Sequence, residues 1–393
     1  MESSWSLALR LAERGFTGAH YPAGAEARGS VTRANSVWAK LLYNRGMEMN
    51  FRSDNESPAA PAVLAAVQEA NSGFAWAYAE DQWSERLDGA FSELFGTHTA
   101  VLPVSTGTAA NSIALAAVTP PWGSVFCHRN AHILNDESGA PEFYGNGLRL
   151  VPIDGPDGKF TSDSLGDIIK ATAGFGVHSY EAAAVSLTQS TESGTVYKPA
   201  EIESLCSMAD QHGLVTHMDG ARFGNAVAAL DCHPGDVSWR AGIRLLSFGA
   251  SKNGCMAAEA LLIFGDGSPA DQALRERVER LRKRSGHLLS KMRYVSAQLL
   301  AYIDGNLWLD MARHANTQAA QFAQAVTNHP EASLEYSVEA NEVFVRWSAA
   351  GFRRLEDAGI QFLTWPGRDD LARFVFSHST QAEETDALCR ALS

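Results

Sequence analysis

Paired cysteines and grouped metal ligands are missing from this chain of 393 residues. The five cysteines are odd in number, widely scattered and free of CxxC spacing, which argues against a disulfide framework and against a zinc site. The twelve histidines include no HExxH pair, so no metal is expected. Reduced thiols are typical of the cytosol, and the sequence therefore predicts a cytoplasmic protein. The cysteines are Cys127, Cys206, Cys232, Cys255 and Cys389.

Basic charge and long apolar runs are also scarce. Lys and Arg number 32 against 45 Asp and Glu, a formal net charge of −13, which would repel nucleic acid. No uninterrupted apolar stretch approaches the roughly 18 residues that a membrane-spanning helix requires. We therefore expect neither a nucleic-acid partner nor membrane insertion. With 45% apolar and 20% charged residues, the composition is that of a soluble globular protein.

The first 48 residues lack the pattern of a targeting segment. They carry six bases and four acids, whereas a transit peptide is poor in acids and a secretory signal has an unbroken apolar centre. Met47 and Met49 stand just before the first organised segment. We therefore favour an N-terminal extension that results from a start codon assigned too far upstream, with a short flexible or oligomer-contacting arm as the alternative.

Apolar periodicity indicates an α/β domain over residues 49–270. Helical spacing over 61–70 and 83–95 comes first, and short β-rich runs then alternate with helical segments such as 109–117 and 199–212. This alternation is typical of βαβ units around a mostly parallel sheet. The expected strands end at Val104, Cys127, Ile153, Thr188, Met218 and Phe248.

The pattern changes after about residue 270. A charged helix is expected first, and helices and strands then follow without the earlier alternation. The sequence thus predicts a smaller α+β domain over residues 271–393. Its expected helices are 271–283, 316–327 and 382–392, and its expected strands are 342–347, 361–364 and 372–377.

Polar residues that directly follow apolar runs are candidate ligand-binding residues, because open α/β sheets bind ligands beyond the carboxyl ends of their strands. The segment 105–111 (STGTAAN) follows the strand that ends at Val104 and opens a helix. Backbone N–H groups at a helix N-terminus suit a phosphate, and Gly107 would let the backbone approach it. An ordinary small-residue turn is the alternative.

A second candidate is the segment 217–222 (HMDGAR). An acid at a strand end, here Asp219, could keep a pyridine nitrogen protonated and so turn the ring into an electron sink, while Arg222 could clamp a carboxylate. An acid and a base three residues apart are also an ordinary surface pair.

The third and fourth candidates are Lys252 and His132. Lys252 stands among small residues in the segment 247–254 (SFGASKNG), where its amine could form a Schiff base, although a solvated loop lysine is the default interpretation. His132 follows a strand, where its imidazole could lie on an aromatic cofactor or could be purely structural. The order of phosphate turn, histidine, strand-end Asp219 and strand-end Lys252 together indicates a site for pyridoxal 5'-phosphate (PLP).

These motifs resemble the L-threonine aldolases, most closely their low-specificity branch, within the β-eliminating lyases and the fold type I PLP enzymes. The resemblance covers roughly residues 50–393. The resemblance implies a homodimer or homotetramer with active sites at subunit interfaces. The matching segments are FRSDN (51–55), GTAAN (107–111), NAHILNDESGAPEF (130–143), HMDGARFGNA (217–226), SKNG (251–254) and ARFVFSH (372–378).

The resemblance implies specific cofactor contacts. Lys252 would form the Schiff base, Asp219 would pair with the pyridine nitrogen, and His132 would stack on the ring. Gly107 and Thr108 would bind the phosphate.

The resemblance also implies substrate contacts and an activity. Arg222 and Arg373, helped by Ser53, would hold the amino-acid carboxylate, with Arg222 also counted among the cofactor-binding residues. Tyr78 or a base in the run 280–284 would reach a neighbouring subunit's cofactor. The expected reaction is retro-aldol cleavage of L-threonine, L-allo-threonine or a related β-hydroxy-α-amino acid such as phenylserine to glycine and an aldehyde.

Two departures from the family pattern bear on this expectation. Glu192 stands where many members have a histidine thought to contact the substrate hydroxyl. The Glu192 carboxylate could accept the hydroxyl proton directly or through water, but the sequence leaves open which group acts as the catalytic base. Ala79 and Glu80 replace a common Gly-Asp pair. Transamination, racemisation and β-elimination use the same electron sink and stay as alternatives. A PLP-binding oligomer that has lost catalysis is a further one.

Overall fold

The computed structural model describes residues 49–174 and 176–392. The expected N-terminal extension, residues 1–48, lies outside the described residues. The described residues form one compact unit.

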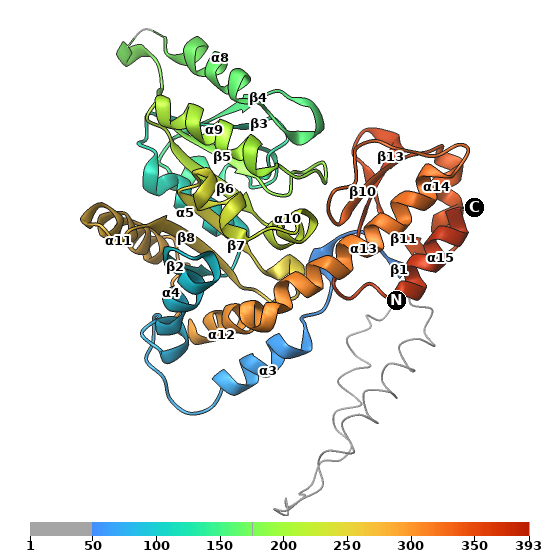
Figure 1. Ribbon diagram of the computed structural model, residues 1–393, viewed down its shortest axis with the longest axis horizontal. Helices are drawn as coiled ribbons and strands as arrows, with labels where there is room; N and C mark the ends of the chain where they lie inside the picture. Colours follow the sequence, from blue (N-terminus) through green and yellow to red (C-terminus); the bar gives the residue numbers. More distant parts are fainter. Residues whose placement is uncertain (1–48, 175, 393) are drawn as a thin grey trace, which may run out of the picture. The chain divides into compact units, whose positions relative to one another are not determined.

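A seven-stranded mixed sheet forms the centre of this unit (Figure 1). The α/β class and the mostly parallel sheet expected from the sequence are confirmed. Strand β8 was missed, and it runs antiparallel to both of its neighbours, β2 and β7. In sheet order the strands are β2 (His98–Val104), β8 (Glu259–Gly265), β7 (Leu245–Gly249), β6 (Val215–Gly220), β5 (Glu181–Thr188), β3 (Gly123–His128) and β4 (Arg149–Ile153).

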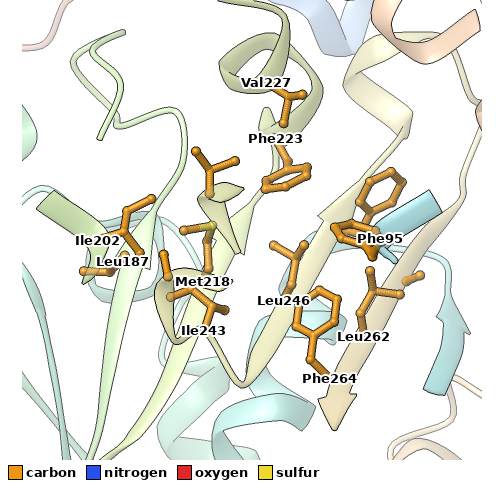
Figure 2. Packing of buried hydrophobic residues seen from close by; sticks show 14 of the residues in the cluster. Phe95, Leu187, Ile202, Met218, Phe223, Val227, Ile243, Leu246, Leu262 and Phe264 are labelled. Carbon is orange, nitrogen blue, oxygen red and sulfur yellow. The ribbon is translucent and has the colours of Figure 1, made fainter. Parts of the chain in front are cut away.

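Helices cover both faces of this sheet, because successive strand residues point to opposite faces. On β7, Leu245 packs in a cluster with α5 (Gly107–Val118) and α11 (Pro269–Arg284). The next residue, Leu246, packs in the opposite cluster, part of which Figure 2 shows. Helices on this second side are α3 (Pro61–Ala70), α4 (Gln82–Phe95), α9 (Pro199–Gln211), α10 (Phe223–Leu230) and α12 (Arg293–Ile303).

Local capping fixes where these helices begin and end. At α4, the Asp81 side chain accepts hydrogen bonds from the backbone N–H groups of Trp83 and Ser84, at 3.1 and 2.9 Å. The helix ends at Gly96, whose left-handed φ of 69° favours glycine. At α5, the Thr106 hydroxyl caps the N–H of Ala109. Three further helices are α6 (His132–Asn135), α7 (Ala140–Tyr144) and α8 (Ser162–Thr172).

A second core lies around an antiparallel sheet near the C-terminus. Helix α13 (Leu307–Thr327) leads into it, and the expected helix 316–327 is the second half of α13. The sheet order is β12 (Leu363–Trp365), β13 (Arg368–Val375), β10 (Glu342–Arg346) and β9 (Ser333–Leu334), packed with α14 (Ala349–Asp357) and α15 (Ala382–Leu392).

The division at residue 270 stays a prediction. Helices α11 and α12 pack on the seven-stranded sheet or its helices, although they follow residue 270. Conversely, β1 (Met49–Asn50) pairs in parallel with β11 (Ile360–Gln361), and Phe51 packs in the C-terminal core. In the described part of the chain, no helix combines the length and the apolar character needed to cross a membrane.

Candidate active site

One pocket of about 580 Å³ gathers most of the expected site residues. It lies between segments that follow the carboxyl ends of β5, β6 and β7 and the antiparallel sheet of β10, β12 and β13. This position agrees with the rule that ligands bind beyond the strand ends. The expected residues that line it are Ser53, His132, Glu192, Arg222, Lys252 and Arg373.

Lys252 occupies a short, well-anchored turn directly after β7. Glu259 accepts a hydrogen bond from the backbone N–H of Ala250 at 2.9 Å, next to the turn. Asn253 donates to the backbone carbonyl of Trp308 at 2.8 Å. Gly254 has a φ of 109°, and a Cβ there would lie 2.8 Å from Met311, so the SKNG segment requires glycine at this position. The turn thus holds the lysine against the pocket.

Asp219 lies at the end of β6 and is only 3% exposed. Its carboxylate accepts hydrogen bonds from the backbone N–H of Ala221 at 3.1 Å and from Asn111 at 2.9 Å. Asn111 also donates to Glu137 at 2.9 Å, and Glu137 contacts Nδ1 of His132 at 2.9 Å. This hydrogen bond raises the pKa of His132.

Asn111 and Glu137 were not expected as site residues. Asn111 lies one helical turn after Gly107 in the GTAAN segment, and Glu137 follows His132 by five residues. The signal for Asn111 was its helical spacing from the phosphate turn. Glu137 lies in the family-like segment 130–143, but the sequence pattern assigned it no role.

The space and the charges of the described residues fit a bound PLP molecule. A Cβ built at Gly107 would meet nothing within 4 Å, so space is open beside the first turn of α5, where the N–H groups of Gly107 and Thr108 precede the capped residue. A ring nitrogen of His132 and carboxylate oxygens of Glu137 and Asp219 lie within 4.8 Å of one another. The two carboxylates favour a positive charge next to them. A protonated pyridine nitrogen beside Asp219 would supply that positive charge.

Arg222 is buried and held by two carboxylates. Its guanidinium donates to Asp54 at 2.7 and 3.0 Å, and Nη1 lies 3.1 Å from Glu342. Burial acts to raise the pKa of Asp54, but Arg222, Lys252 and Asn341 together outweigh it, and the pKa falls below its usual range. Asn341 donates to the same carboxylate at 3.0 Å. Gripping a substrate carboxylate with Arg222 would require Asp54 or Glu342 to give way.

Arg373 is held more loosely than Arg222. Its Nη1 lies 3.5 Å from Glu342, its Nη2 donates to the backbone carbonyl of Arg52 at 3.4 Å, and its Nε has no hydrogen-bond partner among the described residues. The side chain is 17% exposed, against 5% for Arg222. Arg373 therefore has hydrogen-bonding capacity left for a ligand.

Glu192 follows β5 and lines the same pocket. Burial raises its pKa, the charge of Lys252 acts to lower it, and the charge of Glu342 acts to raise it further. The net shift is toward neutrality, which suits a carboxyl group that exchanges protons with a substrate.

Comparisons with known proteins agree with this geometry. Residues 50–350 match the family described as beta-eliminating lyase. The low specificity L-threonine aldolase of Pseudomonas aeruginosa is 41% identical over 340 residues, which is 86% of this chain and 96% of the relative. That of a Pseudomonas species (strain NCIMB 10558) is 39% identical over 84% of this chain and 93% of the relative.

The fold is also shared with a solved structure, the threonine aldolase of Leishmania major. The TM-score is 0.81 at 24% sequence identity, covering 88% of this chain and 98% of that one. The family match and the two Pseudomonas relatives extend over most of the sequence. The chain belongs to the beta-eliminating lyase family of PLP-dependent enzymes.

Proposed function

We propose that this chain is a carbon–carbon lyase of the L-threonine aldolase type, which cleaves β-hydroxy-α-amino acids to glycine and an aldehyde. The observation that carries the proposal is the single pocket shared by Lys252, Glu192 and Arg373, with Asp219 buried behind it. The similarity to two low specificity L-threonine aldolases supports the same reaction.

The residues around the cofactor site have distinct roles in this proposal. Bound PLP supplies an electron sink beside the substrate's α-carbon. Lys252 would hold the cofactor through its amine, the Asp219 carboxylate would favour a proton on the pyridine nitrogen, and His132 would contact the ring. The N–H groups of Gly107 and Thr108 bind the phosphate.

The substrate contacts come from the opposite side of the pocket. Arg373 binds the amino-acid carboxylate, assisted by Ser53 and by the field of the paired Arg222. Glu192 accepts the proton of the β-hydroxyl group, directly or through water, as the Cα–Cβ bond breaks. Aromatic side chains from the C-terminal sheet, including Phe344 and Trp365, line the same pocket and can accommodate a methyl or an aryl substituent.

The assembly proposed is a homodimer or a homotetramer. Phe74 and Trp76 are more than three-quarters exposed, and Tyr78 beside them is 48% exposed. Exposed aromatic side chains are typical of a surface that becomes buried when subunits associate. In this arrangement Tyr78 or a base in the run 280–284 reaches the cofactor of a neighbouring subunit. Cys127, Cys206, Cys232 and Cys255 form no disulfide among the described residues, which supports a cytoplasmic location.

The test is to incubate the purified protein and PLP with L-threonine, L-allo-threonine and L-phenylserine in parallel. Glycine and aldehyde are measured together. Equimolar glycine and aldehyde are expected, and the relative rates rank the substrates. Ammonia and a keto acid, or a keto acid with transfer of the amino group, would replace the aldolase proposal with another PLP reaction. The absence of any product would favour a PLP-binding protein without catalysis.

A further inference from the structure

A chain of buried hydrogen bonds links His132 to Asp219 through Glu137 and Asn111. Nδ1 of His132 lies 2.9 Å from Oε1 of Glu137, and the same oxygen accepts from Nδ2 of Asn111 at 2.9 Å. Nδ2 of Asn111 also donates to Oδ2 of Asp219 at 2.9 Å. Asn111, Glu137 and Asp219 are all at most 5% exposed. The three side chains therefore interact in a medium that strengthens each contact.

The chemistry of these atoms fixes where the protons lie. The amide of Asn111 bridges two carboxylates, so its NH₂ group, with two donors, must face them. A carboxylate only accepts, so Nδ1 of His132 must carry the proton in its contact with Glu137. His132 is 33% exposed and lines the pocket, so the opposite ring nitrogen, Nε2, is the one left to titrate.

We propose that Glu137 is a positioning residue that keeps a proton on Nδ1 of His132, and that Asn111 joins this pair to the carboxylate of Asp219. The inference rests on the PLP site proposed above. His132 then gains or loses a proton only at Nε2. Accepting a proton there makes an imidazolium that Glu137 neutralises, and releasing it restores the neutral ring with Nδ1 still protonated. Glu137 thus orients the imidazole much as a buried carboxylate does in a catalytic triad.

The surrounding charges favour the same assignment. Asp219 and Glu192 also raise the pKa of His132, while burial and the charge of Lys252 act to lower it. Glu137 is the one carboxylate among them in hydrogen-bond contact with the ring. Replacing Glu137 by glutamine removes the charge and lets the side-chain amide offer a donor to Nδ1.

The test compares Glu137→Gln with Glu203→Gln, which removes the same charge from an exposed position on α9. Histidine labelled with ¹⁵N reports the protonation of each ring nitrogen in the cofactor-free protein, and His132→Gln identifies the signal. We expect the parent and Glu203→Gln to hold the proton on Nδ1. In Glu137→Gln the proton should move to Nε2, and the titration midpoint should fall below the ordinary imidazole value of about 6.5.

A second readout is the pH profile of amino-acid cleavage. Glu137→Gln should lower kcat on the order of 100-fold with little change in KM, and Glu137→Asp, which retains the carboxylate, should recover part of the loss. The proposal is wrong if Glu137→Gln keeps both the parent tautomer and the parent midpoint. If Glu137→Gln does not fold, as judged by near-ultraviolet circular dichroism, the parent and Glu137→Asp decide the test, and a neutral His132 ring that carries its proton on Nε2 in both overturns the proposal. Because the spectra need no catalysis, they separate this inference from the aldolase proposal.

Discussion

The two walls of the pocket differ in how firmly they hold their polar groups. We define the sheet wall as Asp219, Lys252 and His132 with their supporting residues, and the C-terminal wall as Arg373 with the aromatic residues from β10 and β12. Asp219 and His132 take part in hydrogen bonds of 2.9 Å, whereas Arg373 has contacts of 3.4 and 3.5 Å. The wall proposed to bind the cofactor is pre-organised, and the wall proposed to meet the substrate keeps unused hydrogen-bonding capacity.

The two arginines show this difference most directly. Arg222 follows β6 and is fully engaged by Asp54 and Glu342. Arg373 shares Glu342 with it, but its Nε has no partner within residues 49–174 and 176–392. Glu342 therefore contacts both arginines, and of the two only Arg373 keeps a donor available to a ligand.

The largest effect is expected for Lys252→Ala, which removes the covalent attachment in the sheet wall. Activity should fall on the order of 10⁴-fold or more, the scale seen when a nucleophile that forms a covalent bond is lost. The visible absorbance of the lysine-bound cofactor should disappear while the fold remains. Absorbance spectra and glycine release measure both effects. Unchanged absorbance would show that another residue holds the cofactor.

Arg222→Ala should weaken the fold, because it leaves Asp54 buried without its ion-pair partner and leaves Glu342 with only the longer contact to Arg373. Breaking a buried ion pair on one side costs about 3–5 kcal/mol of unfolding free energy. Urea denaturation measures this loss. The exposed Arg313, paired with Asp310 at 3.1 Å, is the control, and Arg313→Ala should cost less than about 1 kcal/mol. If Arg222→Ala loses no more unfolding free energy than Arg313→Ala, Arg222 is not held more firmly than an exposed arginine, and its contrast with Arg373 does not stand.

Most of the fold could be predicted from the sequence because its strands and helices have clear periodicity. Strand β8 was the exception in the central sheet, since residues 260–264 (ALLIF), which make up most of it, are a continuous apolar run. Such a run does not distinguish a buried strand from a buried helix. The expected strand 361–364 is divided between β11 and β12. Neither the pairing of β8 with two antiparallel neighbours nor this division has a local signal.

The candidate site was predicted where a residue belongs to a recognisable segment, as Lys252 and Asp219 do. Asp54, Glu342 and Asn111 were missed as partners because their contacts join distant parts of the chain. The bond from Arg222 to Asp54 spans 168 residues, and the bond from Asn111 to Asp219 spans 108. One sequence contains no record of such pairings, which tertiary packing alone creates.

Acid should weaken the sheet wall through His217, which lies two residues before Asp219. Its ring is buried between the hydroxyls of Ser186 and Ser247, at 2.8 and 3.0 Å, and burial lowers its pKa to about 4. Below about pH 6.5 the unfolded chain binds a proton at His217 and the folded chain does not. The contribution of neutral His217 to the free energy of unfolding is therefore present in full above that pH and is lost as the pH falls toward 4. The loss amounts to about 3 kcal/mol.

Urea denaturation of the parent and of His217→Asn across this pH range isolates the contribution of His217. Glu259 has the opposite effect, because burial raises its pKa to about 7 and its contribution to stability decreases as the pH rises through that window. Both proteins carry Glu259, so its contribution to the pH dependence of stability cancels when they are compared. The variant should have a flatter decline in stability below about pH 6.5. Parallel declines in both proteins would contradict the assignment.

Arg373→Ala tests the C-terminal wall, and its effect is on substrate binding rather than on the fold or the covalent attachment. Losing a charge-assisted, bidentate contact to the substrate carboxylate should cost about 3 kcal/mol of binding, or roughly a 100-fold rise in KM. Cofactor absorbance and unfolding free energy should stay near the parent values, because Arg373 is loosely held and its removal leaves Glu342 paired with Arg222. Arg373→Lys keeps the charge and should recover only part of the affinity, since an ammonium group lacks the planar pair of donors. Steady-state kinetics with L-threonine and urea denaturation separate the two outcomes. A large loss of stability with an unchanged KM would make Arg373 a structural residue like Arg222, and the difference between the walls would then no longer account for substrate binding.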